Sequence, residues 1–316
     1  MLNSDGFIPV KPDHLLKNTM LTFDLFELKY DDYELFRSES FPVTTDMIAE
    51  IAEDKERMFF IKETDLGKFH DYQEKYLDTL IASNSTTNLE KAQTIVNVGG
   101  QLISELFSDQ LNPILINRCN NIVKNLITFL RRSNDAAKFL YVSIPSGYSV
   151  YHHSLNVAAL SLSLALELNQ FKPKDLANLG LGAILHDIGM KTVPQKVINK
   201  AGRLNHREYM LVKKHVMWGV RILEELCLLD ANAIAVVQDH HERVDGSGYP
   251  ARKRDDEIHE FGRIAAIADV FDAITSARPY RQAVNPYPAL KKMISFRDGF
   301  DIQFLKAFIK LLGENR

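Results

Sequence analysis

The stretch HHERVDGSGYP, from His240 to Pro250, decides how the second half of this chain is interpreted. Two adjacent histidines close an apolar helical segment, and a turn with two glycines follows at once. Ordering glycine costs backbone entropy, and packing alone does not require two neighbouring imidazoles. Because neither feature helps a chain to fold, we interpret the stretch as part of a functional site.

The other histidines are concentrated in the same half of the sequence. Of the 10 histidines, only His14 and His70 precede residue 150. The others lie on or beside a succession of apolar helical segments: YHHSLNVAALSLSLALEL, DLANLGLGAILHDIGM, REYMLVKKHVMWGVRILEEL, ANAIAVVQDHHERVDG and FGRIAAIADVFDAI. Gly189 lies near the end of the second of these segments and is expected to cap the helix there. We therefore look for the chemistry among these helices.

Two features of these helices indicate metal ligands. Asp269 stands between Ala268 and Val270, and a carboxylate inside an apolar helix is costly unless a cation pairs with it. Neighbours on a helix point about 100° apart, so His186 and Asp187 suit two metals side by side rather than one. The same holds for the tandem histidines. The candidate ligands are His153, His186, Asp187, His215, His240, His241 and Asp269.

The ligand types favour particular metals. Imidazole and carboxylate without thiolate suit iron or manganese, and less exclusively zinc, cobalt or nickel. A single HD dipeptide or a histidine in mid-helix is usually an ordinary surface or core residue. The indication comes from the repetition of such residues on successive helices.

Composition limits the class of protein. The 316 residues are 46% hydrophobic and 25% charged, which is typical of a globular protein. A net charge of -3 argues against binding a nucleic acid polymer. Cys119 and Cys227 form no CxxC pair, which suits a reducing cytoplasm. No apolar run of membrane-spanning length occurs, so we expect a cytoplasmic chain without membrane insertion.

The first 82 residues are expected to form a small α+β domain with a regulatory, docking or purely structural role. The segment LTFDLFEL (Leu21–Leu28) alternates roughly, and a turn at Asp31–Asp32 leads into YELF, which predicts a hairpin. TTDMIAEIAED predicts a short helix, MFFIKE a buried strand, and DLGKFHDYQEKYLDTLI an amphipathic helix.

Polar residues 83–88 mark the boundary that follows. Thr87 and Glu90 form a capping box that opens a helix to about Phe107, and Asn112–Pro113 opens another. We expect residues 83–135 to be a helical connector and residues 136–316 to be the catalytic domain. The predicted fold is mainly α: a C-terminal all-helical bundle with the small N-terminal α+β domain.

Three motifs resemble the HD-GYP phosphodiesterases, a branch of the HD-domain phosphohydrolase superfamily. They are HDIGM, HHERVDGSGYP and RIAAIADVFDAITSARPYR, and the similarity covers about residues 148–312. The resemblance implies an HD-type helical bundle that hydrolyses cyclic di-GMP to pGpG and GMP in bacterial second-messenger signalling. It also implies that the seven candidate residues hold two divalent metals, iron first and manganese second, with Asp187 bridging them. Such a pair lowers the pKa of a shared water that attacks phosphorus.

The resemblance also implies roles around the metals. The substrate contacts would be Lys200, Asp272, Arg278 and Arg281. Within the GYP loop, Gly246 and Gly248 permit a tight turn, Pro250 fixes its exit, and Tyr249 packs. Arg243 and Asp245 hold the loop by hydrogen bonds, and GGDEF-type or other signalling proteins are the expected partners of the loop or the N-terminal domain. Tyr209 and Trp218 are interpreted as core residues.

Two positions depart from the family pattern. Met190 stands where HDIGK has lysine, so phosphate binding is weakened unless Lys191 turns in. Ser149 stands where three-metal members carry glutamate, so two metals are expected, with His152 or a water as the alternative third ligand. Two other functions stay open: a low-activity cyclic di-GMP receptor or partner-binding scaffold, and a hydrolase of another cyclic dinucleotide or nucleotide phosphate ester.

Overall fold

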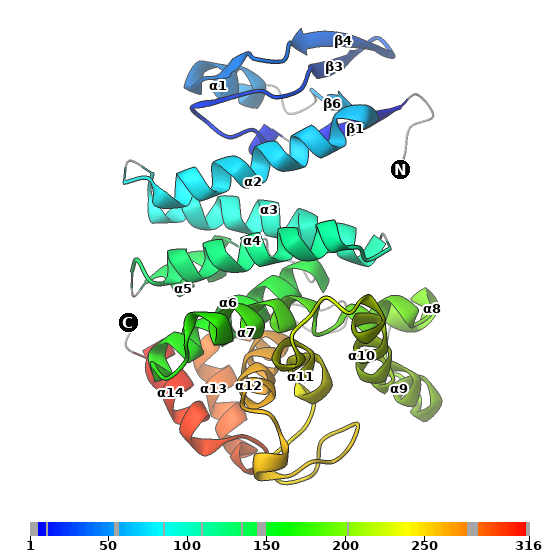
Figure 1. Cartoon of the computed structure of the whole chain (residues 1–316), viewed down its shortest axis with the longest axis vertical. Coiled ribbons are helices and arrows are strands. Elements are labelled where there is room, and N and C mark those ends of the chain that lie inside the picture. Colours follow the sequence, from blue (N-terminus) through cyan, green and yellow to red (C-terminus); the bar gives the residue numbers. More distant parts are fainter. Residues whose placement is uncertain are drawn as a thin grey trace. The chain divides into compact units, whose positions relative to one another are not determined.

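The chain divides into two compact units. The structure is a computed structural model that describes residues 6–10, 12–53, 57–84, 86–108, 110–133, 135–143, 150–200, 202–276 and 284–313. One unit is Met1–Thr87 and the other is Asn88–Arg316 (Figure 1). The first combines a small sheet with helices and the second is helical, so the predicted fold class is confirmed.

The first unit is built on a four-stranded antiparallel sheet of order β1-β6-β3-β4. The strands are β1 (Phe7–Val10), β6 (Phe59–Lys62), β3 (Leu25–Lys29) and β4 (Asp32–Arg37), and a second small sheet pairs β2 (Thr19–Met20) with β5 (Pro42–Val43). The expected hairpin joins β3 to β4, but its turn is wrong by one residue. Lys29 pairs with Asp32, which leaves Tyr30 and Asp31 as the loop, both at positive φ as a two-residue turn requires.

The core of this unit joins the sheet to its helices. Helix α1 (Thr45–Glu53) and helix α2 (Leu66–Ala82) contribute to a buried cluster with strand residues such as Phe59 and Ile61. Tyr72 of α2 is fully buried, and its hydroxyl accepts a hydrogen bond from the backbone of Leu16 at 2.9 Å. Short 3-10 turns, η1 (Pro12–His14) and η2 (Glu63–Asp65), complete the unit.

Glu27 of β3 is a buried carboxylate, 4% exposed, and Arg57 holds it with two hydrogen bonds, one of them 3.0 Å long. These bonds lower the pKa of Glu27. Its contribution to stability is therefore present above the unfolded pKa of about 4.3 and lost as pH falls through the lower folded value. We expect Glu27→Gln to destabilise this unit by about 2 kcal/mol at neutral pH, and by less in acid. Thermal unfolding of the full chain across the acidic range checks this.

Glu34→Gln is the matched control, because Glu34 pairs with Lys29 at 3.5 Å but is 58% exposed. An exposed pair of this kind contributes at most about 1 kcal/mol. Equal losses for the two variants would contradict a special role for the buried carboxylate.

Three helices open the second unit: α3 (Asn88–Ser108), α4 (Pro113–Leu130) and α5 (Ala136–Ser143). Asn112 caps α4 as expected, since its side chain accepts a hydrogen bond from the backbone of Leu115 at 3.0 Å. Helix α3 packs against α4, α5 and α6. The segment that the sequence marks as a connector therefore lies in the same compact unit as the bundle, and the unit begins at Asn88.

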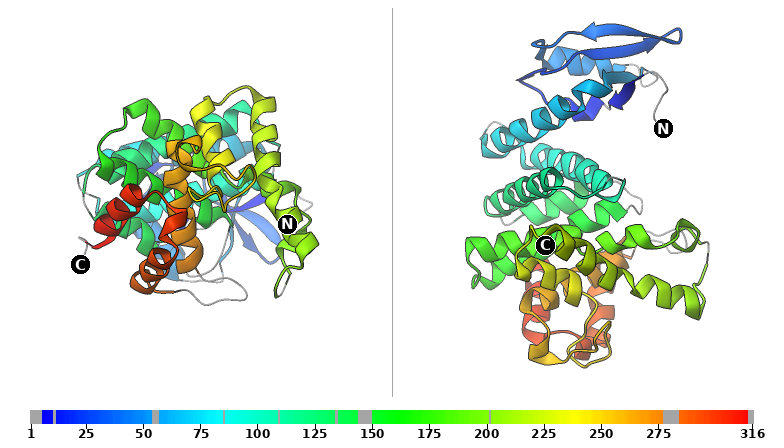
Figure 2. Two further views of the ribbon diagram at one scale, coloured as in Figure 1. Left: turned by 90° about the horizontal axis from the view of Figure 1, so that it is seen from below. Right: turned by 45° about the vertical axis from the view of Figure 1, so that its right-hand side comes forward.

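Helix α6 (Val150–Leu168) lies at the centre of the bundle. It packs against α7 (Pro173–Leu185), α12 (Glu260–Thr275) and α14 (Ile302–Gly313), and α12 also packs against α13 (Pro286–Ser295). The orange to red part of the chain, which holds α12, α13 and α14, gathers in one place in both views of Figure 2. Helix α6 is apolar nearly all round, which is typical of a buried helix. The other elements are η3 (Ile188–Thr192), α8 (Gln195–Ile198), α9 (His206–Lys213), α10 (His215–Leu226), α11 (Ala231–Asp239), η4 (Asp255–Glu257) and η5 (Arg297–Gly299).

Within the described ranges, no helix combines the length and the apolarity needed to cross a bilayer.

Candidate metal centre

The structure brings all seven candidate ligands together. His153 lies near the start of α6, His215 begins α10, and Asp269 lies in α12. The other four stand at helix ends, where His186 and Asp187 join α7 to η3 and the tandem histidines follow α11. They form two groups in which the potential ligand atoms lie within 4.8 Å of one another: Asp187, His215, His240 and His241 in one, and His153, His186 and Asp269 in the other.

Gly189 allows this assembly by close packing, and the predicted helix cap is wrong. A Cβ atom on Gly189 would stand 1.9 Å from the carbonyl oxygen of His215, so only glycine lets η3 approach α10 this closely. Its φ lies outside the positive range that a left-handed cap requires. The contact holds Asp187 near His215.

Backbone carbonyls set the orientation of three imidazoles. In each case Nδ1 donates to the carbonyl oxygen three residues earlier: His186 to Ala183 at 2.8 Å, His215 to Val212 at 2.7 Å and His240 to Val237 at 2.9 Å. A carbonyl only accepts, so Nδ1 carries the hydrogen and Nε2 presents a lone pair. Nε2 of His186 is buried and makes no hydrogen bond within the described residues. Such an orphaned lone pair fits a metal ion.

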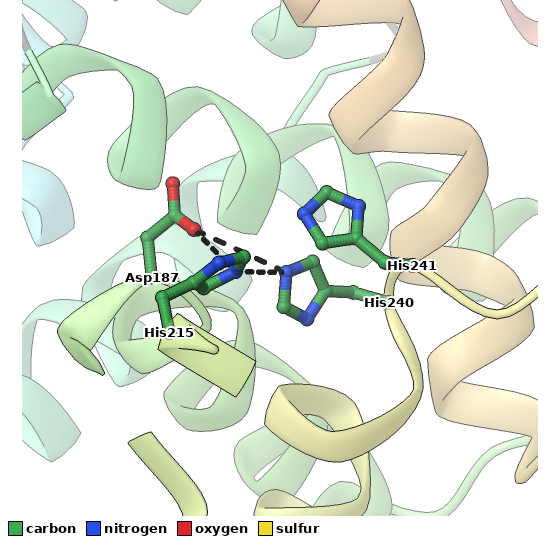
Figure 3. A group of neighbouring side chains, drawn as sticks. All are labelled: Asp187, His215, His240 and His241. Atoms are coloured by element: carbon green, nitrogen blue, oxygen red, sulfur yellow. Dashed lines mark hydrogen bonds and ion pairs between the residues drawn. The ribbon is translucent and has the colours of Figure 1, made fainter. Parts of the chain in front are cut away.

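The two carboxylate oxygens of Asp187 face different groups. Oδ1 lies 3.2 Å from Nε2 of His215 and 4.0 Å from Nε2 of His240, contacts that Figure 3 shows. Oδ2 lies 3.4 Å from Nε2 of His186 and 3.8 Å from Nε2 of His153. This placement suits a carboxylate shared by two cations.

Asp269 also spans the two groups. Its Oδ1 lies 3.3 Å from Nε2 of His153, and its Oδ2 lies 3.6 Å from Nδ1 of His241. Two carboxylates therefore lie among five imidazoles.

The electrostatics of the cluster without metal agree with a cation site. Burial opposes ionisation of Asp187, but the neighbouring histidines hold its pKa well below the usual range. Burial lowers the pKa of His240, and that of His241 to about 3, so both imidazoles are neutral near neutral pH. Burial also opposes a charge on His153, yet hydrogen bonds to Asp269 and Asp272 raise its pKa. Neutral His240 and His241 and the ionised carboxylate of Asp187 are the forms that bind metal. The raised pKa of His153 reflects the negative charge of the neighbouring carboxylates, which a bound cation would also offset.

Asp272 orients a candidate ligand, and its contact with substrate stays a prediction. Its carboxylate accepts hydrogen bonds from Nδ1 of His153 at 2.6 Å and from Nδ2 of Asn156 at 2.7 Å. The side chain has no solvent exposure in this structure, which favours the orienting role. Asn156, one helical turn after His153 on α6, was missed by the sequence analysis, and only its i, i+3 spacing from His153 could have indicated it.

We expect Asp272→Asn to weaken metal binding by about 10–100-fold, as loss of an outer partner of a metal-binding histidine does. The asparagine side chain has one oxygen and one NH2 group in place of the two carboxylate oxygens. It therefore cannot keep both hydrogen bonds, from His153 to one oxygen and from Asn156 to the other. Metal dissociation constants measured by competition with a chelator check this. Glu260→Gln, at the other end of α12, is the control and should bind metal like the wild type; equal affinity in Asp272→Asn would contradict the orienting role.

Two acidic residues that the sequence analysis missed hold the chain after α11. Glu242 is buried and accepts from the backbone nitrogens of Ala251 at 2.6 Å, Arg252 at 3.1 Å and Lys253 at 3.0 Å. Asp239 accepts from Nζ of Lys253 at 2.7 Å and from the backbone of His259 at 3.0 Å. Both residues flank the tandem histidines in the run DHHE. This position beside two candidate ligands was the only sign in the sequence that they have a structural role.

The GYP loop packs against the cluster. Arg243 donates to the carbonyl oxygens of His240 at 3.1 Å and Glu242 at 2.7 Å, and Asp245 accepts from the backbone of Ser247 at 2.9 Å. Gly246 has φ +79°, and Gly248 leaves no room for a Cβ atom, which would stand 2.4 Å from the backbone nitrogen of Arg243. The ring of Tyr249, which leads into Pro250, lies 4.6 Å from that of His241.

Other predicted positions lie elsewhere or outside the described residues. Nζ of Lys200 donates to Glu208 at 2.6 Å, so its charge is paired. Lys191 does not turn into the site in place of Met190, because its Nζ donates to the carbonyl oxygen of Leu106 at 2.7 Å. Ser149, Arg278 and Arg281 fall outside the described ranges.

His152, Tyr209 and Trp218 lie outside the ligand cluster. His152 belongs to neither ligand group, and its ring lies near Gly100 of α3, where an added Cβ would be 3.6 Å away. Tyr209 is 47% exposed, so its prediction as a core residue is wrong; Trp218 is partly buried. Helix α9 buries none of its residues, so Tyr209 has no core to enter there.

Known proteins resemble parts of this chain. A family model described as HD domain matches residues 111–303. The cyclic di-GMP phosphodiesterase PA4108 of Pseudomonas aeruginosa is 37% identical over 184 residues, which cover 58% of this chain and 44% of that protein. The 3'3'-cGAMP-specific phosphodiesterase 2 of Vibrio cholerae is 44% identical over 100 residues, covering 31% of this chain and 19% of that protein. The matched segments thus span less than half the length of these two relatives.

A solved structure resembles the whole chain. It is Bd1817, described as a HDG"Y"P protein from Bdellovibrio bacteriovorus, with a TM-score of 0.74 and 20% identity, and the match covers 97% of this chain and 99% of that one. At this identity the likeness shows the fold.

Proposed function

The chain belongs to the HD domain family, and from this premise we propose that its metal centre hydrolyses cyclic di-GMP to pGpG and GMP. The observation that carries the proposal is the cluster in which Asp187 directs one oxygen toward each ligand group. Relatives named as phosphodiesterases of cyclic di-GMP and of 3'3'-cGAMP support a cyclic dinucleotide as the substrate class.

The residues of the cluster fit two divalent cations, iron first and manganese second. All the donors are imidazole or carboxylate, which is the set these metals accept. Bound cations would lower the pKa of a water and offset the charge that develops on the phosphate. This chain has Ser149 where three-metal members of the family carry a glutamate ligand, and His152 lies outside both ligand groups. Both observations support two metals rather than three.

The chain's own residues would prepare the site before substrate arrives. The bonds from Nδ1 to carbonyls hold His186, His215 and His240 with Nε2 inward, so little reorganisation is needed. Asp272 does the same for His153. Arg278 and Arg281 stay predictions as phosphate or guanine contacts, and Lys200 would contact substrate only after leaving Glu208.

Anaerobic reconstitution with iron or manganese, followed by product chromatography, tests the proposal. The expected result is conversion of cyclic di-GMP to pGpG and GMP that a chelator abolishes. A parallel reaction with 3'3'-cGAMP decides between the two dinucleotides named for the relatives, and nucleotide phosphate monoesters serve as the other substrate class. Absence of turnover of every cyclic dinucleotide in the metal-loaded protein would refute the proposal.

A low-activity receptor or scaffold is the second candidate. One observation favours it: Met190 replaces a lysine, and Lys191 points toward Leu106. Tight binding of cyclic di-GMP without hydrolysis, unchanged in Met190→Lys, would support this alternative. Faster hydrolysis in Met190→Lys would instead support an enzyme that lacks one phosphate contact.

The proposal also covers the first unit, the protein partners and the cellular compartment. We assign residues 1–82 a regulatory or docking role, with GGDEF-type or other signalling proteins as partners of that unit or of the GYP loop. Cys119 and Cys227 form no disulfide, in keeping with a reducing cytoplasm. Pull-down with the full chain and with a variant that changes the exposed loop residue Ser247 to arginine tests the loop as a docking element.

A further inference from the structure

Lys213 lies between two tyrosine rings beside the metal centre. Its Nζ is 4.7 Å from the ring centroid of Tyr209 and 4.5 Å from that of Tyr249. The Tyr249 ring in turn lies 4.6 Å from the ring of His241, tilted by 30°. Lys213 is the last residue of α9 and lies two residues before the candidate ligand His215. Its position is therefore tied to that of the ligand cluster.

Among the described residues, no acidic side chain neutralises the charge of Lys213. In the described part of the protein its ammonium forms no ion pair, whereas Lys200 pairs with Glu208 and Lys191 donates to a carbonyl oxygen. Aromatic faces attract an ammonium without cancelling its charge. They also leave N–H donors available, since a lysine ammonium has three.

The site is open to a ligand. Tyr209 is 47% exposed, and Lys213 and Tyr249 are partly exposed. Two aromatic walls that restrict the lysine reduce the entropy it loses when it binds an anion. The feature therefore has the composition of an anion subsite: a fixed, accessible cation with no counter-ion of its own.

We propose that Lys213 binds the phosphate of a cyclic dinucleotide that is not being cleaved, an inference that rests on the proposed function. Such a substrate carries two phosphates, and the one that reacts must lie against the ligand cluster. The Tyr249 ring contacts both the ammonium of Lys213 and the ring of His241, so Lys213 lies beside the ligand cluster rather than in it and is placed for the other phosphate. A substrate with a single phosphate has no second phosphate for Lys213 to bind.

The test compares two substrates in Lys213→Met. For cyclic di-GMP we expect KM to rise roughly tenfold or more, because a charged hydrogen bond to phosphate is lost, with kcat changed little. Hydrolysis of bis(p-nitrophenyl) phosphate, which has one phosphate, should stay at the wild-type rate, and so should the metal content. Lys213→Arg should recover most of the affinity.

Lys214→Met is the matched control, since it removes the same charge from the next, exposed position. An unchanged KM for cyclic di-GMP in Lys213→Met would overturn the inference. An equal loss with bis(p-nitrophenyl) phosphate would also overturn it, because Lys213 would then serve the reacting phosphate or the metal cluster.

The failure of the proposed function has a different signature. If the wild type does not hydrolyse cyclic di-GMP, its inhibition constant against bis(p-nitrophenyl) phosphate hydrolysis replaces KM as the measure of binding. A weaker inhibition constant in Lys213→Met supports the subsite even then. Equal inhibition constants, or no inhibition of the wild type, overturn it.

Discussion

Asp187→Asn is expected to remove at least one of two metal equivalents and to reduce phosphodiesterase turnover by more than about 10²–10³-fold. Loss of one group that stabilises charge in an active site costs about that much in turnover. Asp187 lies beside both ligand groups. Its oxygens lie 3.2 Å from His215 and 3.4 Å from His186, so removing its charge weakens two cation positions at once. Elemental analysis and dinucleotide hydrolysis measure the two effects.

The fold of the variant should survive. Asparagine has nearly the shape of aspartate, and the backbone carbonyls, rather than Asp187, orient His186 and His215. Asp175→Asn, the same change at the other end of α7, is the control and should keep metal and activity. Full metal content in Asp187→Asn would contradict the assignment of Asp187 as a ligand.

Glu242→Gln is expected to lower the free energy of unfolding by about 3 kcal/mol and to loosen the GYP loop. The buried carboxylate accepts three backbone hydrogen bonds, from residues 251 to 253, and a hydrogen bond to a charged group contributes about 1.5–3 kcal/mol. Glutamine keeps one acceptor oxygen and turns an amide donor toward at least one N–H group. Urea unfolding measures the stability.

Hydrogen exchange locates this effect. The amides of Ala251, Arg252 and Lys253 should exchange faster in Glu242→Gln, because their acceptor is weakened. Glu257→Gln is the control in the same loop, since Glu257 accepts a single hydrogen bond from Arg254 at 2.8 Å at an exposed position. Unchanged exchange at residues 251–253 would show that Glu242 does not hold the loop.

Local patterns in the sequence were sufficient for much of the fold and for the ligands. Caps such as Asn112–Pro113 and apolar periodicity depend on residues a few positions apart, so helix positions could be predicted. The resemblance to HD-GYP phosphodiesterases is confirmed by the family match and the relatives. Those motifs are local too, so the seven residues that meet in the cluster could be named in advance.

Apart from the hairpin turn, which was one residue out, the features that the sequence did not indicate depend on neighbours distant in sequence. Gly189 looks like a helix cap until α10 is packed against it. Asp272 shares a helix face with Asp269, but its bond to His153 spans 119 positions of sequence. Tyr209 is aromatic, yet nothing in its own segment shows that α9 leaves it exposed.

By itself, then, the sequence determined which helices form and which side chains are candidate metal ligands, since both follow from residue type and short-range spacing. Only the tertiary structure decided how those side chains divide into two groups, which oxygen of Asp187 serves each, and that two rings enclose Lys213. The physical reason is that these relations are distances of a few ångströms between atoms from different helices, and packing between the helices sets them.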